Sequence, residues 1–221
     1  MNVLAFDTTT DACSAALWTG RAIAARRFEI LGRGHVERLV EMVVEVMDEA
    51  AIGFDGLDLI AVTVGPGTFT GVRIGLAAAR GFGLAAGLPV AGFTTLEVLA
   101  GGVGAVERQG RGVIAAMDAR RGQIYRQTFD ADSAALDEPA AVDRSGLAAP
   151  PGTWLAVGTG AAAYADIDGV DPVAGRDLPD AAVLAALAAR RFAGGAQPVP
   201  DRAPGPLYLR APDADLPAGR T

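Results

Sequence analysis

The chain has 221 residues, a formal net charge of −7 and a pI near 4.7, a balance that opposes autonomous binding to a phosphate backbone. Its 19 basic residues are all arginine, which excludes a P-loop lysine and a Schiff-base lysine. One histidine and one cysteine are too few for a zinc site made of nitrogen and sulfur ligands, and no serine stands in G-x-S-x-G. The sequence has neither a leader-like start nor an apolar run of about 20 residues, so we expect a cytoplasmic protein that does not enter a membrane.

The first 30 residues predict a small antiparallel meander. Apolar segments at 2–7, 13–18 and 21–30 have strand composition, and "TTTDA" after Asp7 supplies turn residues. The next segment, 35–51, has apolar residues at helical spacing and predicts an amphipathic helix. His35 stands where this helix begins, so we interpret it as a capping or surface residue.

The polar face of that helix carries Glu37, Glu41, Glu45 and Glu49 at steps of four residues. Like charges at this spacing disfavour a helix by a few tenths of a kcal/mol per pair. A solvated helix face is the favoured interpretation. The alternative is an acidic docking surface for a basic partner.

"GPGTFTGVRIG", residues 65–75, follows a predicted buried strand and begins a helix predicted over 71–88. A strand, a glycine-rich loop and a helix resemble a phosphate cradle, but the Walker spacing fails. The small residues of the helix repeat every four positions and so share one stripe: Gly71, Gly75, Ala79 and Gly83. Such a stripe permits close packing against an internal neighbour or against another subunit, and the pattern does not choose between them.

The second half of the chain repeats the first. "VIAAMDARRGQIYRQTF" has the pattern of "NVLAFDTTTDACSAALW", a strand that ends in aspartate, a polar turn and a second strand. The glycine-rich stretch 101–112 is a predicted junction, so we expect domains at 1–105 and 106–221, with a frayed tail from about 211. A helix is predicted to begin at Asp177, and a short ordered segment is predicted around Tyr208.

Four segments together resemble the bacterial TsaB (YeaZ) family: "LAFDTTTDACSAAL", the stretch from "GPGTFTG" to "LEVLA", "MDARRGQIY" and the late "YLR". The resemblance implies an α/β fold of two related subdomains of the actin/sugar-kinase/Hsp70-like (ribonuclease H-like) superfold, each a mixed sheet flanked by helices. It also implies a role in making threonylcarbamoyladenosine at position 37 of tRNAs that read codons beginning with A.

In that family the protein is a noncatalytic scaffold for the paralogous catalytic subunit TsaD, and the ATPase TsaE joins them. The resemblance therefore implies TsaD and TsaE as partners, a homodimer when TsaD is absent, and tRNA contact only through the complex. TsaD has a histidine pair that holds a metal; the matching positions here are Thr95 and Leu99, which do not replace imidazoles. We expect the partner interface to use the small-residue stripe and the acidic face, namely Gly71, Gly75, Ala79, Gly83, Glu37, Glu41 and Glu45.

A vestigial nucleotide site is the other candidate in this sequence. Active relatives of the superfold use an aspartate like Asp7 to organise magnesium-bound nucleotide, and the candidate residues are Asp7, Thr8, Asp118, Gly158 and Gly160. Arg120 and Arg121 follow Asp118 where close backbone approach would be needed, so we expect no cofactor on the isolated chain, and ATP or ADP only at the TsaD boundary. Turn capping is the plainer interpretation of both aspartates. An ATP-dependent small-molecule kinase is the alternative function, and a peptidase has least support.

Overall fold

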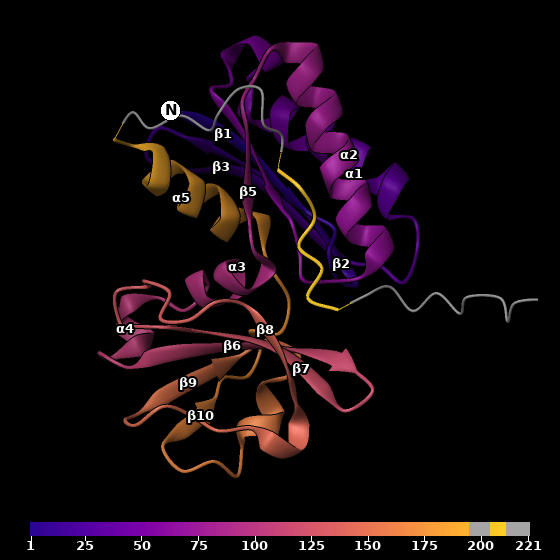
Figure 1. The fold of residues 1–221 in the computed structure, drawn as a ribbon. Helices are drawn as coiled ribbons and strands as arrows, with labels where there is room; N and C mark the ends of the chain where they lie inside the picture. The colour runs from indigo at the N-terminus through magenta and orange to yellow at the C-terminus, as the bar shows by residue number, and fades with distance from the viewer. Residues whose placement is uncertain (195–203, 211–221) are drawn as a thin grey trace, which may run out of the picture.

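A computed structural model describes residues 1–194 and 204–210, which build two five-stranded sheets one above the other (Figure 1). The strand order is β3-β2-β1-β4-β5 in the first sheet and β10-β9-β6-β7-β8 in the second. The first contains β1 (Asn2–Asp7), β2 (Ala12–Thr19), β3 (Ala22–Ile30), β4 (Leu59–Thr63) and β5 (Val90–Phe93). The second contains β6 (Gly112–Arg120), β7 (Gln123–Phe129), β8 (Ala140–Asp143), β9 (Trp154–Val157) and β10 (Val170–Pro172).

The two sheets share one topology. In each, three strands form an antiparallel meander, a fourth strand pairs in parallel with the first strand of the meander, and a fifth pairs in parallel with the fourth. The meander follows from short polar turns between apolar strands, whereas a parallel strand needs a longer connection. The internal duplication and the fold class, two mixed sheets flanked by helices, are confirmed.

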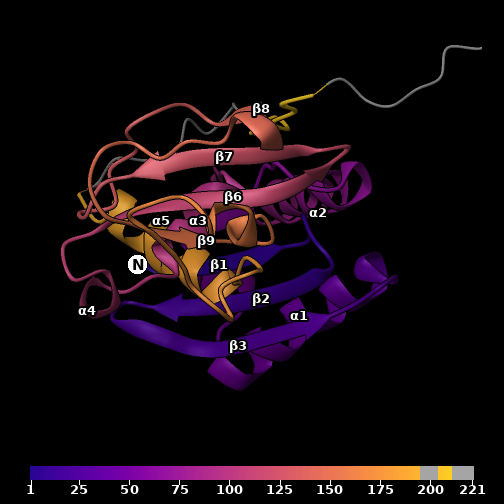
Figure 2. The same ribbon diagram turned by 90° about the horizontal axis from the view of Figure 1, so that it is seen from below.

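Helices cover both faces of the first sheet. α1 (His35–Ala50) and α2 (Phe69–Ala86) pack on one face, and α5 (Ala181–Phe192) packs on the other (Figures 1 and 2). α3 (Thr95–Gly101) packs on the second sheet, followed by the short α4 (Ala105–Arg108). The short 3-10 helices are η1 (Phe54–Gly56), η2 (Arg144–Gly146) and η3 (Ala161–Tyr164).

Several helix boundaries in the structure differ from those predicted from the sequence. α2 begins at Phe69 because the Thr68 side chain accepts a hydrogen bond from Gly71 N at 3.1 Å and caps the helix. α5 begins at Ala181 instead of Asp177, since Asp180 is the residue that caps it. The predicted junction 101–112 contains α4, so it is not wholly irregular.

α5 lies in the second half of the chain but belongs to the core of the first sheet. Its buried face, including Leu184 and Ala188, contacts Val3 and Ala5 of β1. Assigning this helix to the second unit was therefore wrong, because its apolar face matches a sheet face that α1 and α2 leave open. The split at 105/106 falls between the two sheets and stays a prediction as a domain boundary. The tail predicted from 211 lies outside the described residues.

No helix within residues 1–194 and 204–210 has both the length and the apolar character needed to cross a membrane.

Candidate functional site

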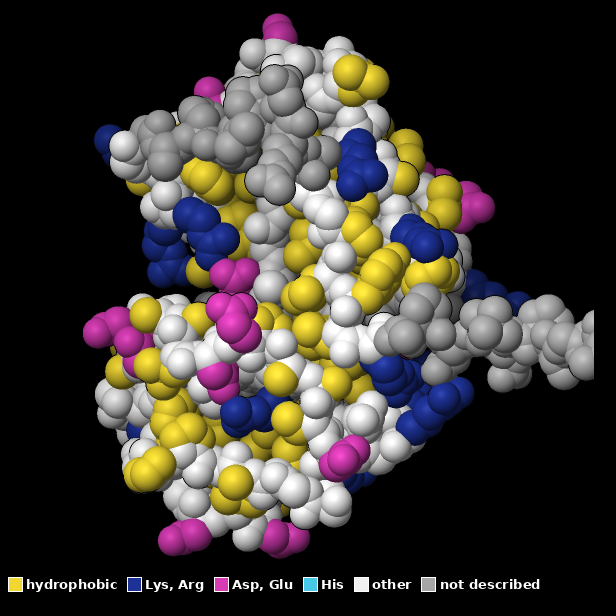
Figure 3. Space-filling model, viewed as in Figure 1, with side chains coloured by type: hydrophobic (Ala, Val, Ile, Leu, Met, Phe, Trp, Pro, Cys, Tyr) yellow, Lys and Arg dark blue, Asp and Glu magenta, His cyan; other side chains and the backbone are white. Residues whose placement is uncertain are grey.

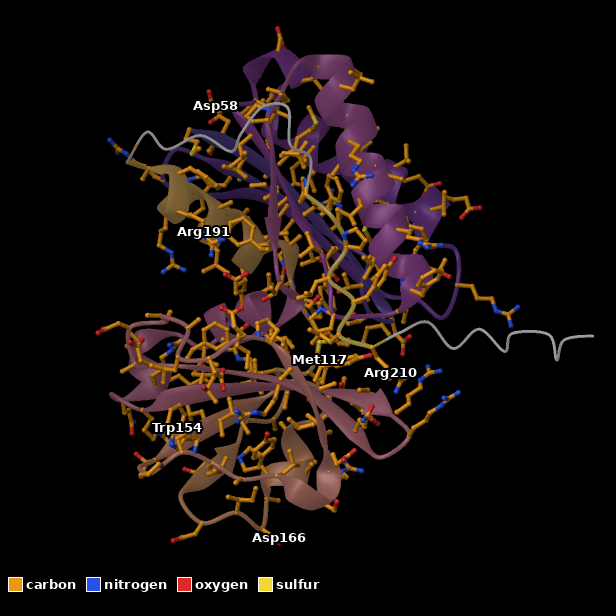
Figure 4. All side chains as sticks on the ribbon, in the orientation of Figure 1. Asp58, Met117, Trp154, Asp166, Arg191 and Arg210 are labelled. Atoms are coloured by element: carbon orange, nitrogen blue, oxygen red, sulfur yellow. The ribbon has the colours of Figure 1, made fainter. Side chains whose placement is uncertain are left out.

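A cleft of about 660 Å³ opens where the two sheets meet (Figure 3). Its walls come from the β1–β2 turn, the loop before α2, the ends of β6 and β7, and the segment 207–210. The lining includes Thr9, Thr10, Asp11, Pro66, Gly67, Thr68, Phe69, Met117, Asp118, Arg120, Tyr125, Thr159, Tyr208 and Arg210. Met117 of β6 and Arg210 of the segment 207–210, both labelled in Figure 4, line this cleft.

The glycine-rich loop packs directly on the β1–β2 turn. Thr68 N donates to Thr9 O at 2.7 Å, and Thr8 Oγ1 donates to Gly71 O at 2.7 Å. A Cβ on Gly71 would lie 2.0 Å from Thr8 O, and one on Gly67 would lie 2.3 Å from Thr9 O. The bare backbone of the loop is therefore required by the close approach of the chain's own β1–β2 turn.

The rest of the small-residue stripe also faces inward. A Cβ on Gly75 would lie 2.9 Å from Thr8 Oγ1, one on Gly83 would lie 2.6 Å from Val90, and Ala79 is fully buried against the first sheet. These residues are enclosed within the single chain. The prediction that Gly71, Gly75, Ala79 and Gly83 contact a partner is thus corrected, because they are buried and serve internal packing.

The acidic face of α1 is largely neutralised by arginines of the same chain. Arg38 contacts Glu29 and Glu45 at 2.6 Å each and Glu41 at 3.1 Å, and Arg27 contacts Glu45 at 2.7 Å. Glu49, the last acid of this helix face, also pairs with Arg27. Glu37 is exposed. The acids thus form an intramolecular network across α1 and β3, and their role in binding a partner stays a prediction.

Asp7 is completely buried beneath the turn. Its carboxylate accepts hydrogen bonds from Thr9 Oγ1 at 2.7 Å and from Thr63 Oγ1, which lies on the neighbouring strand β4. Burial raises the pKa of Asp7 to about 6, although the hydrogen bonds from Thr63 and Thr9 oppose that rise. Enclosed and hydrogen-bonded in this way, the carboxylate caps the turn at the end of β1.

We expect Asp7→Asn to stabilise the protein at neutral pH. Burial raises the pKa of Asp7 in the folded state from its ordinary value of 3.8 to about 6, so the stability that protonated Asp7 contributes is complete below 3.8 and is lost as pH rises through about 6. At pH 8 the variant should have a free energy of unfolding about 2–3 kcal/mol higher than the original, and the gap should close towards pH 4. Urea unfolding at pH 4, 6 and 8 measures this; an equal gap at all three values would contradict the assignment.

Of the other candidate nucleotide residues, Thr8 adjoins Asp7 and bonds to Gly71, whereas Asp118 lines the cleft together with Thr9 and Thr10. Asp118 is exposed at the cleft and accepts a hydrogen bond from Arg120 N at 2.8 Å, which is the predicted turn-capping role. A Cβ on Gly158 would lie 2.1 Å from Ala116 O, and one on Gly160 would lie 3.1 Å from Ala116 C. Both glycines therefore permit close packing of the β9–η3 turn against β6.

The positions that match the histidine pair of TsaD lie in the core. Thr95 is buried and its Oγ1 donates to Thr9 Oγ1 at 3.1 Å, and Leu99 is buried among the residues of the second sheet. Within residues 1–194 and 204–210, no group of three or more His, Cys, Asp or Glu side chains is placed to hold a metal ion.

Sequence reasoning missed the packing of residues 204–210 along α2 and the cleft. Leu207 N donates to Val64 O at 2.7 Å, Arg80 Nη2 donates to Pro204 O at 2.9 Å, and Arg210 Nη1 donates to Ala119 O at 3.1 Å. The apolar "PLYL" indicated order but gave no sign of the surface it would cover.

Comparison with known proteins agrees with this fold. The family model TsaD, tRNA N6-adenosine threonylcarbamoyltransferase, matches residues 29–167, more than half of the chain. The tRNA threonylcarbamoyladenosine biosynthesis protein TsaB of Escherichia coli (strain K12) is 35% identical over 222 residues, covering 95% of each chain. The chain belongs to the TsaB/YeaZ family. YeaZ from Pseudomonas aeruginosa superposes with a TM-score of 0.81 at 30% identity, covering 94% of this chain and 99% of that one.

Two further proteins also match almost the whole chain. A second Pseudomonas aeruginosa structure, described as similar to peptidase YeaZ, has a TM-score of 0.83 at 30% identity and covers 95% of this chain and 99% of its own. An uncharacterized protein of Mycobacterium tuberculosis (strain ATCC 25618 / H37Rv) is 34% identical over 215 residues, covering 96% of this chain and 93% of its own. The resemblance to this family that the sequence motifs indicate is therefore confirmed.

Proposed function

We propose that this TsaB-family chain acts in tRNA threonylcarbamoyladenosine biosynthesis as the noncatalytic partner of a TsaD-family subunit. The name of the Escherichia coli relative supports the pathway, and the match of the TsaD family model supports descent from a common ancestor with the catalytic subunit. TsaE joins this pair in our proposal, and two copies of the chain associate when TsaD is absent.

The observation that carries the proposal is an apolar stripe on the outward face of α1. Val36, Val40 and Val44 lie one turn apart, and their exposed fractions are 55%, 49% and 54%. Leu84 on neighbouring α2 is also exposed. Single exposed apolar residues are ordinary, but a row of them on paired helices is typical of a surface that another protein covers. We call Val36, Val40 and Val44 the valine stripe.

A noncatalytic role is supported by the residues that stand where the resemblance would place nucleotide-binding and metal-binding side chains. The carboxylate of Asp7 is enclosed by Thr9 and Thr63, so it is not presented to a magnesium-bound nucleotide. Thr95 and Leu99 are packing residues. We therefore propose that the isolated chain binds no cofactor, and that ATP or ADP is held only at the boundary with TsaD.

The test is to mix the purified chain with the TsaD-family protein of the same organism and to determine the mass of the product. We expect a stable complex of the two chains, because covering the valine stripe removes apolar surface from water. A calorimetric titration of the isolated chain with ATP and Mg²⁺ serves as the control for the kinase alternative, and we expect no micromolar binding. Two chains that stay separate at micromolar concentration would refute the proposal.

A further inference from the structure

Residues 204–210 form one wall of the cleft and belong to neither sheet. We call them the strap. The strap follows α5 in the sequence, but it lies beside α2 and runs towards the second sheet, as the yellow segment of Figure 1 shows. Its second half, 207–210, lines the cleft of about 660 Å³. The strap therefore connects the two units at the cleft.

The backbone of the first unit is shaped to receive the strap. A Cβ on Gly65 would lie 2.8 Å from Leu207 O. A Cβ on Gly92 would lie 2.6 Å from both Pro204 Cβ and Val64 Cγ1. Leu207 N donates a hydrogen bond to Val64 O at 2.7 Å. Since a side chain at Gly65 would clash with the strap backbone, the strap occupies a defined place on this unit.

Side chains of α2 hold the strap from outside. The Phe69 and Tyr208 rings stack with centroids 5.4 Å apart, and Arg73 Nε donates to the Tyr208 hydroxyl at 3.1 Å. Arg80 Nη2 donates to Pro204 O at 2.9 Å. Both arginine hydrogen bonds are exposed, and exposed hydrogen bonds open locally at low free energy. The strap can thus leave its place while the first sheet stays folded.

The end of the strap reaches the second unit, where Arg210 Nη1 donates to Ala119 O at 3.1 Å. α3 links the two units in a different way, by buried packing. Val98 belongs to the core that α5 shares with the first sheet, whereas Leu96 and Leu99 belong to the core of the second sheet. Moving α3 would open both cores. α3 is therefore the fixed link between the units, and the strap is the link that can be released.

We propose that the strap is a latch on the cleft. When it is docked on Gly65 and α2, it holds the second sheet in the arrangement of Figure 1. When it is released, the second sheet pivots about α3 and the cleft widens, which is a hinge motion of one unit against another. The strap thereby controls access to the cleft. This device does not depend on the proposed function, because it acts within the single chain.

Two methionines of the full chain report on the cleft and on folding separately. Met117 lines the cleft and is 5% exposed, whereas Met47 lies in the core between α1 and the first sheet and is 6% exposed. Hydrogen peroxide converts accessible methionine to the sulfoxide. Mass spectrometry of peptides gives the oxidation rate of each residue. Opening of the cleft raises the rate at Met117 alone, and unfolding raises both rates.

Leu207→Pro releases the strap because it removes the N–H that bonds to Val64 O. Gly205→Ala is the matched control within the strap, since Gly205 is exposed and no atom lies within 4 Å of a Cβ built there. We expect Leu207→Pro to raise the oxidation rate of Met117 relative to Met47 about fivefold, the effect of one lost hydrogen bond on a docking equilibrium. The control should leave this ratio unchanged.

Tyr208→Ala is a second way to release the strap, because it removes the ring that stacks on Phe69. It should raise the Met117 ratio in the same direction. An unchanged ratio in both strap variants would overturn the proposal. An equal rise at Met117 and Met47 in both would overturn it as well, because the strap would then be part of the folded core and not a releasable link.

A distance measurement separates pivoting of the second sheet from simple uncovering of Met117. Cys13 is the single cysteine of the chain and is fully buried, so spin labels can be attached at Thr70→Cys on α2 and Ser145→Cys on η2, both exposed positions. We expect Leu207→Pro to lengthen the mean distance between the labels by more than about 2 Å, and Gly205→Ala to leave it unchanged. The same distance in both variants would overturn the latch.

Discussion

Replacing Gly71 with alanine is expected to lower the free energy of unfolding by about 3 kcal/mol or more. The new Cβ would lie 2.0 Å from Thr8 O and 2.6 Å from Thr68 Oγ1. Thr8 O is a backbone atom directly after the central strand β1 and cannot move easily. The clash is therefore removed only if α2 moves away from the sheet. That movement would break the bond from Thr8 Oγ1 to Gly71 O.

Gly81 in the same helix provides the matched control. No atom lies within 4 Å of a Cβ built there, and the residue is exposed. Gly81→Ala should therefore be neutral or should stabilise the protein by about 0.5–1 kcal/mol, because alanine is the better helix former. Urea unfolding of both variants measures the difference. Similar midpoints for the two would show that the close approach at Gly71 is absent.

Val40→Arg is expected to weaken association with the TsaD-family subunit at least 30-fold, equivalent to about 2 kcal/mol, the effect of losing a central interface residue. Val40 is the middle of the valine stripe, and its side chain is 49% exposed in the single chain. An arginine there extends into water when the chain is alone, so folding should be retained. In a covered interface the same guanidinium would be buried among apolar side chains without a carboxylate to pair with.

Val106→Arg on α4 is the control, since that valine is 90% exposed and lies outside the paired helices. Thermal midpoints establish that both variants fold, and copurification with the tagged partner gives the affinity. Equal copurification of the Val40 and Val106 variants would show that the valine stripe is not part of the interface.

The spacing of apolar residues predicted most of the strands and helices, because this spacing reflects secondary structure that forms between neighbouring residues. Alternating and helical apolar patterns gave β1, β2, β3, α1 and α2, and the offset repeat gave the shared topology of the two sheets. The placement of α5 was missed because the sequence does not show which of the two sheets its apolar face packs on. Only the packing of Leu184 against residues near the start of the chain decides it.

The candidate site was predicted less well, for reasons visible in individual contacts. A stripe of small residues has the same pattern whether an internal neighbour or a second subunit approaches it, and the deciding neighbour of Gly71 is Thr8, 63 positions earlier. The acidic stripe of α1 is partnered by Arg27 on a strand, which no helical spacing reveals. The prediction of turn capping at Asp7 and Asp118 is consistent with their hydrogen bonds.

The most direct test of a noncatalytic partner is threonylcarbamoyl transfer to tRNA by the reconstituted complex. We expect no transfer from this chain alone, and transfer by the complex at an unchanged rate when Asp7→Asn replaces the original chain, because Asp7 lies buried in the turn and touches no substrate. Transfer by the pure isolated chain, or loss of transfer in a complex that still assembles with the Asp7→Asn chain, would contradict the account.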